Sequence, residues 1–193
     1  MTFNIDNTLT IKETSGVSYM EPGLHDDCEM TGVTKKVASN GRSYLEFTFV
    51  NSTNEVLTHA EWDTDPERVT ARPGESNDEA VARKVKNMLM RIKHIGTKFI
   101  PEDQFVIKAQ SFDDLCGAIV TALTGKGAGK KVRIKVVYNY NDYSSLPNYC
   151  PFIESMSTTP SGLKINKNYD KMEKASEAVA AEAGGTDESQ LPF

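Results

Sequence analysis

One turn signal constrains the fold of this chain more than any other feature of its sequence. Asn40-Gly41 separates two runs of β-favouring residues, 28–37 and 43–50. Both residues of an Asn-Gly pair tolerate positive φ, and such a pair between β-rich runs is the strongest short-range signal for a β-hairpin. In the second run, apolar residues at odd positions alternate with Tyr44, Glu46 and Thr48. The chain is therefore expected to build its core around an antiparallel hairpin with one buried face.

The hairpin pattern continues into a longer order of elements. A turn at residues 51–54 and a β-rich run at 55–62 predict a third strand and hence a meander. Residues 1–18 alternate weakly through Phe3, Ile5, Leu9 and Ile11, and are a candidate edge strand. The remaining expected elements are a polar loop at 63–78, a helix at 79–95 capped by Asn77 or Asp78, a helix at 111–123 capped by Ser111 and ended by Gly125, a strand at 130–140 and a last strand at 149–153.

Three strands, two helices and two strands in this order match one known architecture. The OB fold is a five-stranded barrel, and here a two-helix insertion would lie between strands 3 and 4. The expected fold class is thus mainly β with α insertions (α+β), although a β-sandwich or another α+β layout would give a similar pattern. Residues 1–160 are expected to form this domain. After Pro160-Ser161-Gly162 the apolar pattern fades, so residues 161–193 are expected to be a disordered acidic tail.

The charges are segregated along the chain, which makes the net charge of −5 a poor guide to partners. Residues 83–98 hold six bases and no acid, and residues 126–135 hold five bases and no acid. Binding responds to local potential more than to total charge, so these stretches favour an anionic partner. No run is long enough to span a membrane, and residues 1–14 lack the pattern of a signal peptide, so a cytoplasmic location is expected.

Cysteine and histidine are too scattered to predict a metal site or a disulfide framework. The three cysteines are Cys28, Cys116 and Cys150, and the histidines are His25, His59 and His94. None of the cysteines lies in a CxxC pair. We therefore expect no metal and no cofactor.

Cations and aromatic rings cluster in a way that suits single-stranded DNA. Binding such DNA without sequence preference requires cations along the backbone and aromatic faces for the bases. The candidate residues are Lys35, Lys36 and Arg42 at the hairpin, Trp62 at the end of the third strand, Lys126, Lys130, Lys131, Arg133 and Lys135 in the second basic stretch, and Tyr138, Tyr140, Tyr143 and Tyr149. The alternatives are that the tyrosines pack at a barrel rim, that Trp62 belongs to the core, and that the lysines form a solvated face.

The last residues carry the most specific motif. An acidic pair, Asp187-Glu188, precedes a chain end of Leu191-Pro192-Phe193. A terminal Phe offers a ring and a carboxylate to an apolar pocket rimmed by cations. This end resembles the acidic C-terminal tip of bacterial and bacteriophage single-stranded DNA-binding proteins, although Ser189-Gln190 makes it less acidic. The resemblance implies a protein that coats single-stranded DNA and recruits replication, recombination or repair proteins through its tip.

No catalytic motif is present, so the expected function is binding rather than catalysis. The segment TGKGAGKK lacks the spacing and the strand-to-helix context of a phosphate-binding loop. Two alternatives stay open. One is a metal-dependent nuclease that uses the acidic run Glu61, Asp63, Asp65 and Glu67, and the other is an adaptor or virion component that binds only proteins. The sequence leaves the oligomeric state open, and a homo-oligomer remains among the alternatives.

Overall fold

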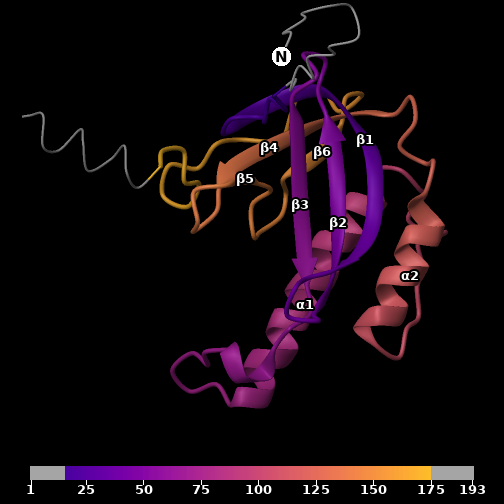
Figure 1. Ribbon diagram of the computed structural model, residues 1–193. Coiled ribbons are helices and arrows are strands. Elements are labelled where there is room, and N and C mark those ends of the chain that lie inside the picture. The colour runs from indigo at the N-terminus through magenta and orange to yellow at the C-terminus, as the bar shows by residue number, and fades with distance from the viewer. Residues whose placement is uncertain (1–15, 175–193) are drawn as a thin grey trace, which may run out of the picture.

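The computed structural model describes residues 16–174, which form a mixed α/β structure with an open, mostly antiparallel sheet (Figure 1). In this part of the chain the strands are β1 (Gly23–Val37), β2 (Ser43–Val50), β3 (Val56–Trp62), β4 (Lys131–Tyr138), β5 (Ser144–Ser145) and β6 (Ile153–Ser155). The helices are the 3-10 turn η1 (Pro66–Arg68), α1 (Asn77–Gly96) and α2 (Phe112–Leu123). No helix of the described residues is long and apolar enough to cross a membrane.

Strand β1 is the longest element of the sheet and joins its two parts. The strand order is β3-β2-β1-β4-β5, and β6 pairs with β4. Over Gly23–Glu29 strand β1 pairs with β4, and over Glu29–Val37 it pairs with β2, both antiparallel. No ladder joins β3 to β5 among these strands, so the sheet does not close into the barrel expected from the sequence.

The hairpin, the meander and both helices expected from the sequence are confirmed. Gly41 alone takes a left-handed conformation in the first turn, with φ of +79°, and Ala38 N–H bonds Arg42 O at 2.9 Å. Helix α1 starts slightly earlier than expected because Ser76 caps it and forms a reciprocal capping box with Glu79. Ser111 caps α2 as predicted.

The strands at the C-terminal end of the sheet differ from expectation. Strand β4 ends at Tyr138, and the last strand is Ile153–Ser155 instead of residues 149–153. Pro147 and Pro151 lack the N–H that a ladder requires, so pairing resumes only beyond them.

The core lies between the sheet and the two helices. Leu45, Phe47 and Phe49 alternate along β2 and are fully buried. They share one cluster with Ile92 of α1 and Ile119 of α2. Figure 1 shows α1 behind the meander and α2 beside β1. Because the helices cover one side only, the meander keeps an outer face whose side chains point away from them.

Residues 156–174, here called the C-terminal strap, pack against the sheet after β6. Leu163 and Asp170 are buried, and Tyr138 N–H donates to Lys171 O at 2.8 Å. The packed body thus continues past residue 160, where the sequence places the start of the tail. The proposed edge strand within residues 1–15 and the tip residues Asp187, Glu188, Leu191, Pro192 and Phe193 lie outside the described residues.

Candidate nucleic-acid interface

The register of the meander places an aromatic pair on its outer face. Tyr44 of β2 lies opposite Trp62 of β3 and opposite Lys36 of β1, so the three side chains form one cross-strand row. The neighbouring row holds Thr34, Glu46 and Ala60. Cross-strand neighbours on one face approach closely enough for their side chains to interact.

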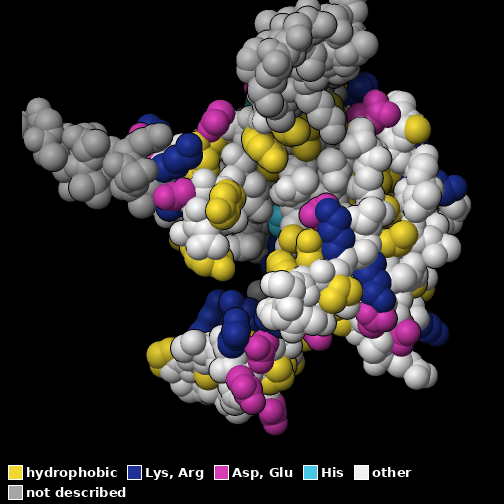
Figure 2. All heavy atoms as spheres, in the orientation of Figure 1, with side chains coloured by type: hydrophobic (Ala, Val, Ile, Leu, Met, Phe, Trp, Pro, Cys, Tyr) yellow, Lys and Arg dark blue, Asp and Glu magenta, His cyan; other side chains and the backbone are white. Residues whose placement is uncertain are grey.

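Tyr44 and Trp62 form a ready-made stacking platform. Their ring centroids are 4.4 Å apart and their planes are inclined by 22°. Trp62 is 40% exposed, so a ring face and edge remain available to solvent. Figure 2, which views the meander from this side, shows hydrophobic and cationic side chains gathered over its strands. The sequence left Trp62 open between core and surface, and the structure places it on the surface.

Two cations flank this platform. The Arg42 guanidinium lies 5.9 Å from the centre of the Trp62 ring and donates to Asp63 O at 2.7 Å. The Lys36 ammonium pairs with Glu46 at 2.6 Å, which raises the pKa of Lys36. These groups are at least partly exposed, and exposed ion pairs contribute little to stability. A phosphate is therefore able to replace Glu46 as the partner of Lys36 at small cost.

A shallow hollow beside the β1–β2 turn extends this region toward α2. It is lined by Gly41, Arg42, Ser43, Asp63, Ser111, Phe112 and Asp113. Asp113 binds the Lys35 ammonium at 2.5 Å and accepts a bond from Ser43 Oγ at 3.0 Å, and both bonds lower the pKa of Asp113. Lys35, a predicted cation of the interface, thus lies close to the platform in an ion pair with Asp113.

The β4–β5 hairpin presents two of the predicted tyrosines. Tyr140 is 89% exposed and Tyr143 is 69% exposed. Asn139 Oδ1 accepts bonds from the N–H groups of Asn141 at 2.8 Å and Tyr143 at 3.1 Å, which fixes the turn. At the base of this hairpin, Ser145 Oγ lies 3.1 Å from His59 Nδ1 of β3. The hairpin therefore stands next to the edge of the meander that carries Trp62.

Lys135 and Tyr138, both predicted to contact DNA, are buried instead. The Lys135 ammonium donates to Asp170 Oδ2 at 3.0 Å, Tyr149 Oη at 3.0 Å and Lys164 O at 3.2 Å. Burial raises the pKa of Asp170, but bonds from Asn166 N–H, Tyr149 and Lys135 outweigh it and hold that pKa below its usual value. Tyr138 donates its hydroxyl to Glu21 at 2.5 Å. Strand alternation places Lys135 on the face opposite Ile134 and Val136, as expected, but the strap covers that face. Tyr138 has the parity of Ile134 and Val136, so alternation places it on their face of the strand.

The remaining predicted cations are divided among other surfaces. Arg133 pairs with Asp26 and, at 2.6 Å, with Glu154. Lys131 pairs with Glu29 at 3.0 Å, and Lys130 donates to Phe99 O at 2.5 Å. Lys126 is exposed at the tip of the loop between α2 and β4. This loop borders the free edge of β1, away from the platform.

A buried polar cluster that the sequence did not reveal bridges the open side of the sheet. Arg91 of α1 holds both carboxylate oxygens of Glu61 at 2.6 Å, and Glu61 Oε1 lies 3.0 Å from His59 Nε2. Burial raises the pKa of Glu61, but the bonds from His59 and Arg91 leave it below its ordinary value. Arg91 also donates to Asn148 O at 3.3 Å, which ties β3 to the segment after β5.

The position of Glu61 in this cluster tests whether the acidic run at residues 61–67 could hold a metal ion. Glu61 points into the interior and is committed to Arg91, while Asp65 accepts a bond from Glu67 N–H at 3.2 Å and caps η1. The carboxylates of this run therefore do not converge on one point. Within residues 16–174 no group of three or more such side chains is arranged to hold a metal ion.

Of the predicted site residues, the structure brings together Lys36, Arg42 and Trp62, with Lys35 nearby, and places Tyr140 and Tyr143 on the adjoining hairpin. Tyr149 is at the border of exposure and is engaged with Lys135. The prediction missed Tyr44. The turn at residues 51–54 pairs Val50 with Val56, and counting back along both strands places Tyr44 opposite Trp62.

Comparison with family models and with curated proteins gives no match to this chain.

Proposed function

We propose that this protein binds single-stranded DNA without sequence preference on the outer face of its meander. The observation that carries the proposal is the exposed Tyr44–Trp62 stack flanked by Arg42 and Lys36. Stacking of one base on an aromatic side chain contributes about 1–3 kcal/mol and suits any base. Arg42 and Lys36 supply the salt-sensitive attraction to phosphate.

The connectivity supports this location. We infer that the fold is an opened relative of the OB barrel, because β1 pairs with both β2 and β4 and the helices fall between β3 and β4. OB barrels bind oligonucleotides on the face of strands 2 and 3, between the loops that join strands 1–2 and 4–5. In this chain those loops carry Arg42 and the pair Tyr140 and Tyr143. The DNA path proposed here runs from the platform toward that hairpin.

The partners follow from the same proposal. We propose that Asp187, Glu188 and Leu191-Pro192-Phe193 recruit replication or recombination proteins, that the protein acts in the cytoplasm, and that it is not an enzyme. These statements rest on the sequence.

The chain contains one tryptophan, so intrinsic fluorescence reports on the proposed site directly. Titration with an oligo(dT) strand at low salt should quench Trp62 emission, and a duplex of the same length should quench it much less. Tyr44→Ala keeps Trp62, whose emission is measured, but removes the other ring of the platform. We expect this variant to bind oligo(dT) with about 5- to 150-fold lower affinity, the equivalent of about 1–3 kcal/mol.

A matched control is Tyr169→Ala, which removes a 76% exposed tyrosine of the strap. Its affinity should equal that of the unmodified protein. Equal affinities for all three proteins, or binding that leaves Trp62 emission unchanged, would show that DNA does not bind at the platform.

A further inference from the structure

The shallow hollow between the β1–β2 turn and the start of α2 has the size of a small-ligand pocket. Its volume is about 310 Å³, near the lower end of the range of about 300–1,000 Å³ that such pockets cover. Arg42, Asp63 and Phe112 contribute a cation, an anion and an aromatic ring to its lining. Phe112 packs against the core but is only half-buried, so part of its ring is left to the hollow. The hollow thus has the groups that a flat, polar ring needs.

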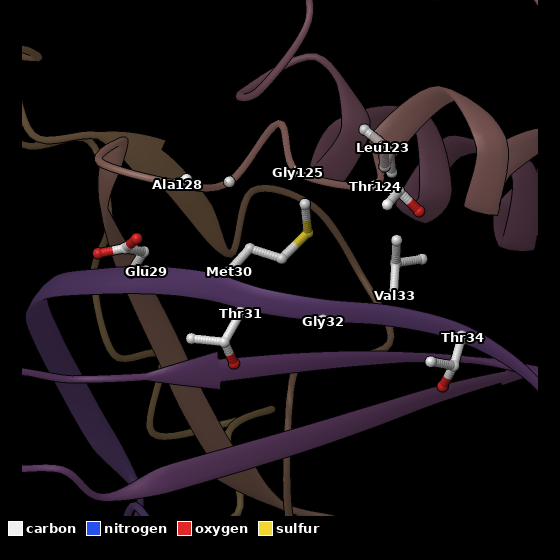
Figure 3. Close-up of a pocket in the computed structure, with 11 residues that line it drawn as sticks. Glu29, Met30, Thr31, Gly32, Val33, Thr34, Leu123, Thr124, Gly125 and Ala128 are labelled. Atoms are coloured by element: carbon white, nitrogen blue, oxygen red, sulfur yellow. The ribbon is translucent and has the colours of Figure 1, made fainter.

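A larger groove along β1 lacks these groups. It measures about 460 Å³ and lies between residues 29–34 and the chain from Leu123 to Ala128 (Figure 3). Glu29 is the one charged residue among the described residues that line it, and its carboxylate already accepts Gly129 N–H at 2.9 Å and the Lys131 ammonium at 3.0 Å. The groove therefore presents no unpaired charge to a ligand.

Asp63 gives the smaller hollow an acceptor that is still free. Its backbone oxygen accepts Arg42 at 2.7 Å, but within residues 16–174 no hydrogen bond or ion pair engages its carboxylate. Burial raises the pKa of Cys116 in α2 to about 11, and against the charge of Lys35 the charges of Asp113 and Asp63 add to this rise. The Asp63 carboxylate is thus close to α2, on the side where the hollow lies.

Arg42 borders both the hollow and the platform. Its guanidinium lines the hollow and lies 5.9 Å from the centre of the Trp62 ring. An arginine carries several N–H donors, of which one is given to Asp63 O. Donors therefore remain for an acceptor in the hollow as well as for a phosphate. A base in the hollow would be the neighbour of a base stacked on the Tyr44–Trp62 pair.

Guanine is the base whose hydrogen-bonding edge matches these two groups. Its N1–H and N2–H donors lie side by side and fit the two oxygens of a carboxylate, while its O6 and N7 accept from arginine. Thymine has a single N–H donor, and adenine and cytosine place an unprotonated ring nitrogen beside their amino group, which a carboxylate repels. Unpaired bases are commonly recognised on these edges while they stack on a side chain.

We propose that the hollow binds one guanine of a single strand, next to the base on the platform. The Asp63 carboxylate accepts the N1–H and N2–H of this guanine, Arg42 donates to its O6, and the Phe112 ring packs against it. The other bases of the strand are bound without preference. This inference rests on the proposed function and adds a preference at one position of the DNA.

Competition against a labelled oligo(dT) strand measures this preference in the full chain. A short oligo(dT) strand with one central dG should compete about 5- to 150-fold better than oligo(dT) alone, as expected of one bidentate base contact. A strand with hypoxanthine in place of that guanine lacks the N2 amino group and should lose most of the advantage. Hypoxanthine is also a purine, so it separates hydrogen bonding at Asp63 from the stacking of a larger ring.

Two variants test the role of the carboxylate. Asp63→Asn replaces one acceptor oxygen with an amide that donates, so it should bind the dG strand no better than oligo(dT), and oligo(dT) at least as tightly as the unmodified chain does. Asp103→Asn makes the same change at an exposed aspartate that does not line the hollow, and it should keep the preference.

The outcomes separate this inference from the proposed function. Failure of oligo(dT) to bind the unmodified chain would overturn both together. Equal competition by the dG strand and oligo(dT), equal competition by guanine and hypoxanthine, or a preference that survives in Asp63→Asn would overturn the inference alone. A preference for guanine that Asp63→Asn removes and Asp103→Asn retains supports it.

Discussion

Two regions of this molecule place a cation over an aromatic ring, and they differ in what surrounds the pair. At the platform, the Arg42 guanidinium lies 5.9 Å from the Trp62 ring centre at the surface. Under the strap, the Lys135 ammonium lies 4.6 Å from the Tyr149 ring centre and is buried. Arg42 has one backbone acceptor, whereas Lys135 has three protein acceptors including Asp170. A cation beside an aromatic ring is thus exposed in one place, where we propose that it meets a ligand, and is buried within the fold in the other.

The largest effect is expected at the buried pair. Lys135→Met leaves the Asp170 carboxylate, which is fully buried as a side chain, without its charged partner. Removing one member of a buried ion pair costs about 3–5 kcal/mol. Urea unfolding at neutral pH should show this loss in the free energy of unfolding, while the affinity of the folded variant for oligo(dT) stays unchanged.

The double variant Lys135→Met with Asp170→Leu separates charge from packing. With both charges removed, it should recover part of the lost stability. If Lys135→Met instead weakened DNA binding and left stability intact, Lys135 would belong with the platform, and the contrast between the two regions would disappear.

These two regions also show how far the sequence could predict the site. Alternation and turn signals are local, so the meander, its outer face and both helices could be predicted from residues near one another in the chain. The cover over Lys135 is supplied by Asp170, 35 residues later, from a segment with few apolar residues. No local pattern marks that segment as packed, because its anchors are one leucine and one carboxylate. Tyr44 was missed for a different reason: its role depends on the register with Trp62.

A smaller effect is expected from pH, at His94 of α1, which contacts the chain at the start of β6. His94 Nε2 accepts the N–H groups of Phe152 at 3.3 Å and Ile153 at 3.4 Å, so the folded protein requires its unprotonated form. Burial, with a further contribution from Lys98, lowers the pKa of His94 from 6.5 to about 4. Between these values the unfolded chain binds more protons, so the free energy of unfolding should fall as pH falls from 6.5 to 4.

His94→Gln provides the comparison for this pH dependence. The variant should be less stable at neutral pH but should lose less stability between pH 6.5 and 4 than the unmodified protein, in urea titrations at each pH. If the variant lost as much stability between pH 6.5 and 4 as the unmodified protein, the acid sensitivity would belong to groups other than His94.

The smallest effect is expected in the salt dependence of binding, where Arg42 is tested against a cation outside the platform. A protein that neutralises phosphates of a single strand loses affinity with salt, and each contact contributes about 0.7 to the slope of log K against log salt. Arg42→Ala should therefore reduce that slope by about 0.7 in oligo(dT) titrations at several salt concentrations. Arg68→Ala removes an exposed arginine of η1 and should leave the slope unchanged. If Arg42→Ala and Arg68→Ala had the same slope of log K against log salt, Arg42 would contact Asp63 and the Trp62 ring but no phosphate of the DNA. The platform would then bind bases by stacking alone, and the difference between the two cation–ring pairs would be one of exposure and not of function.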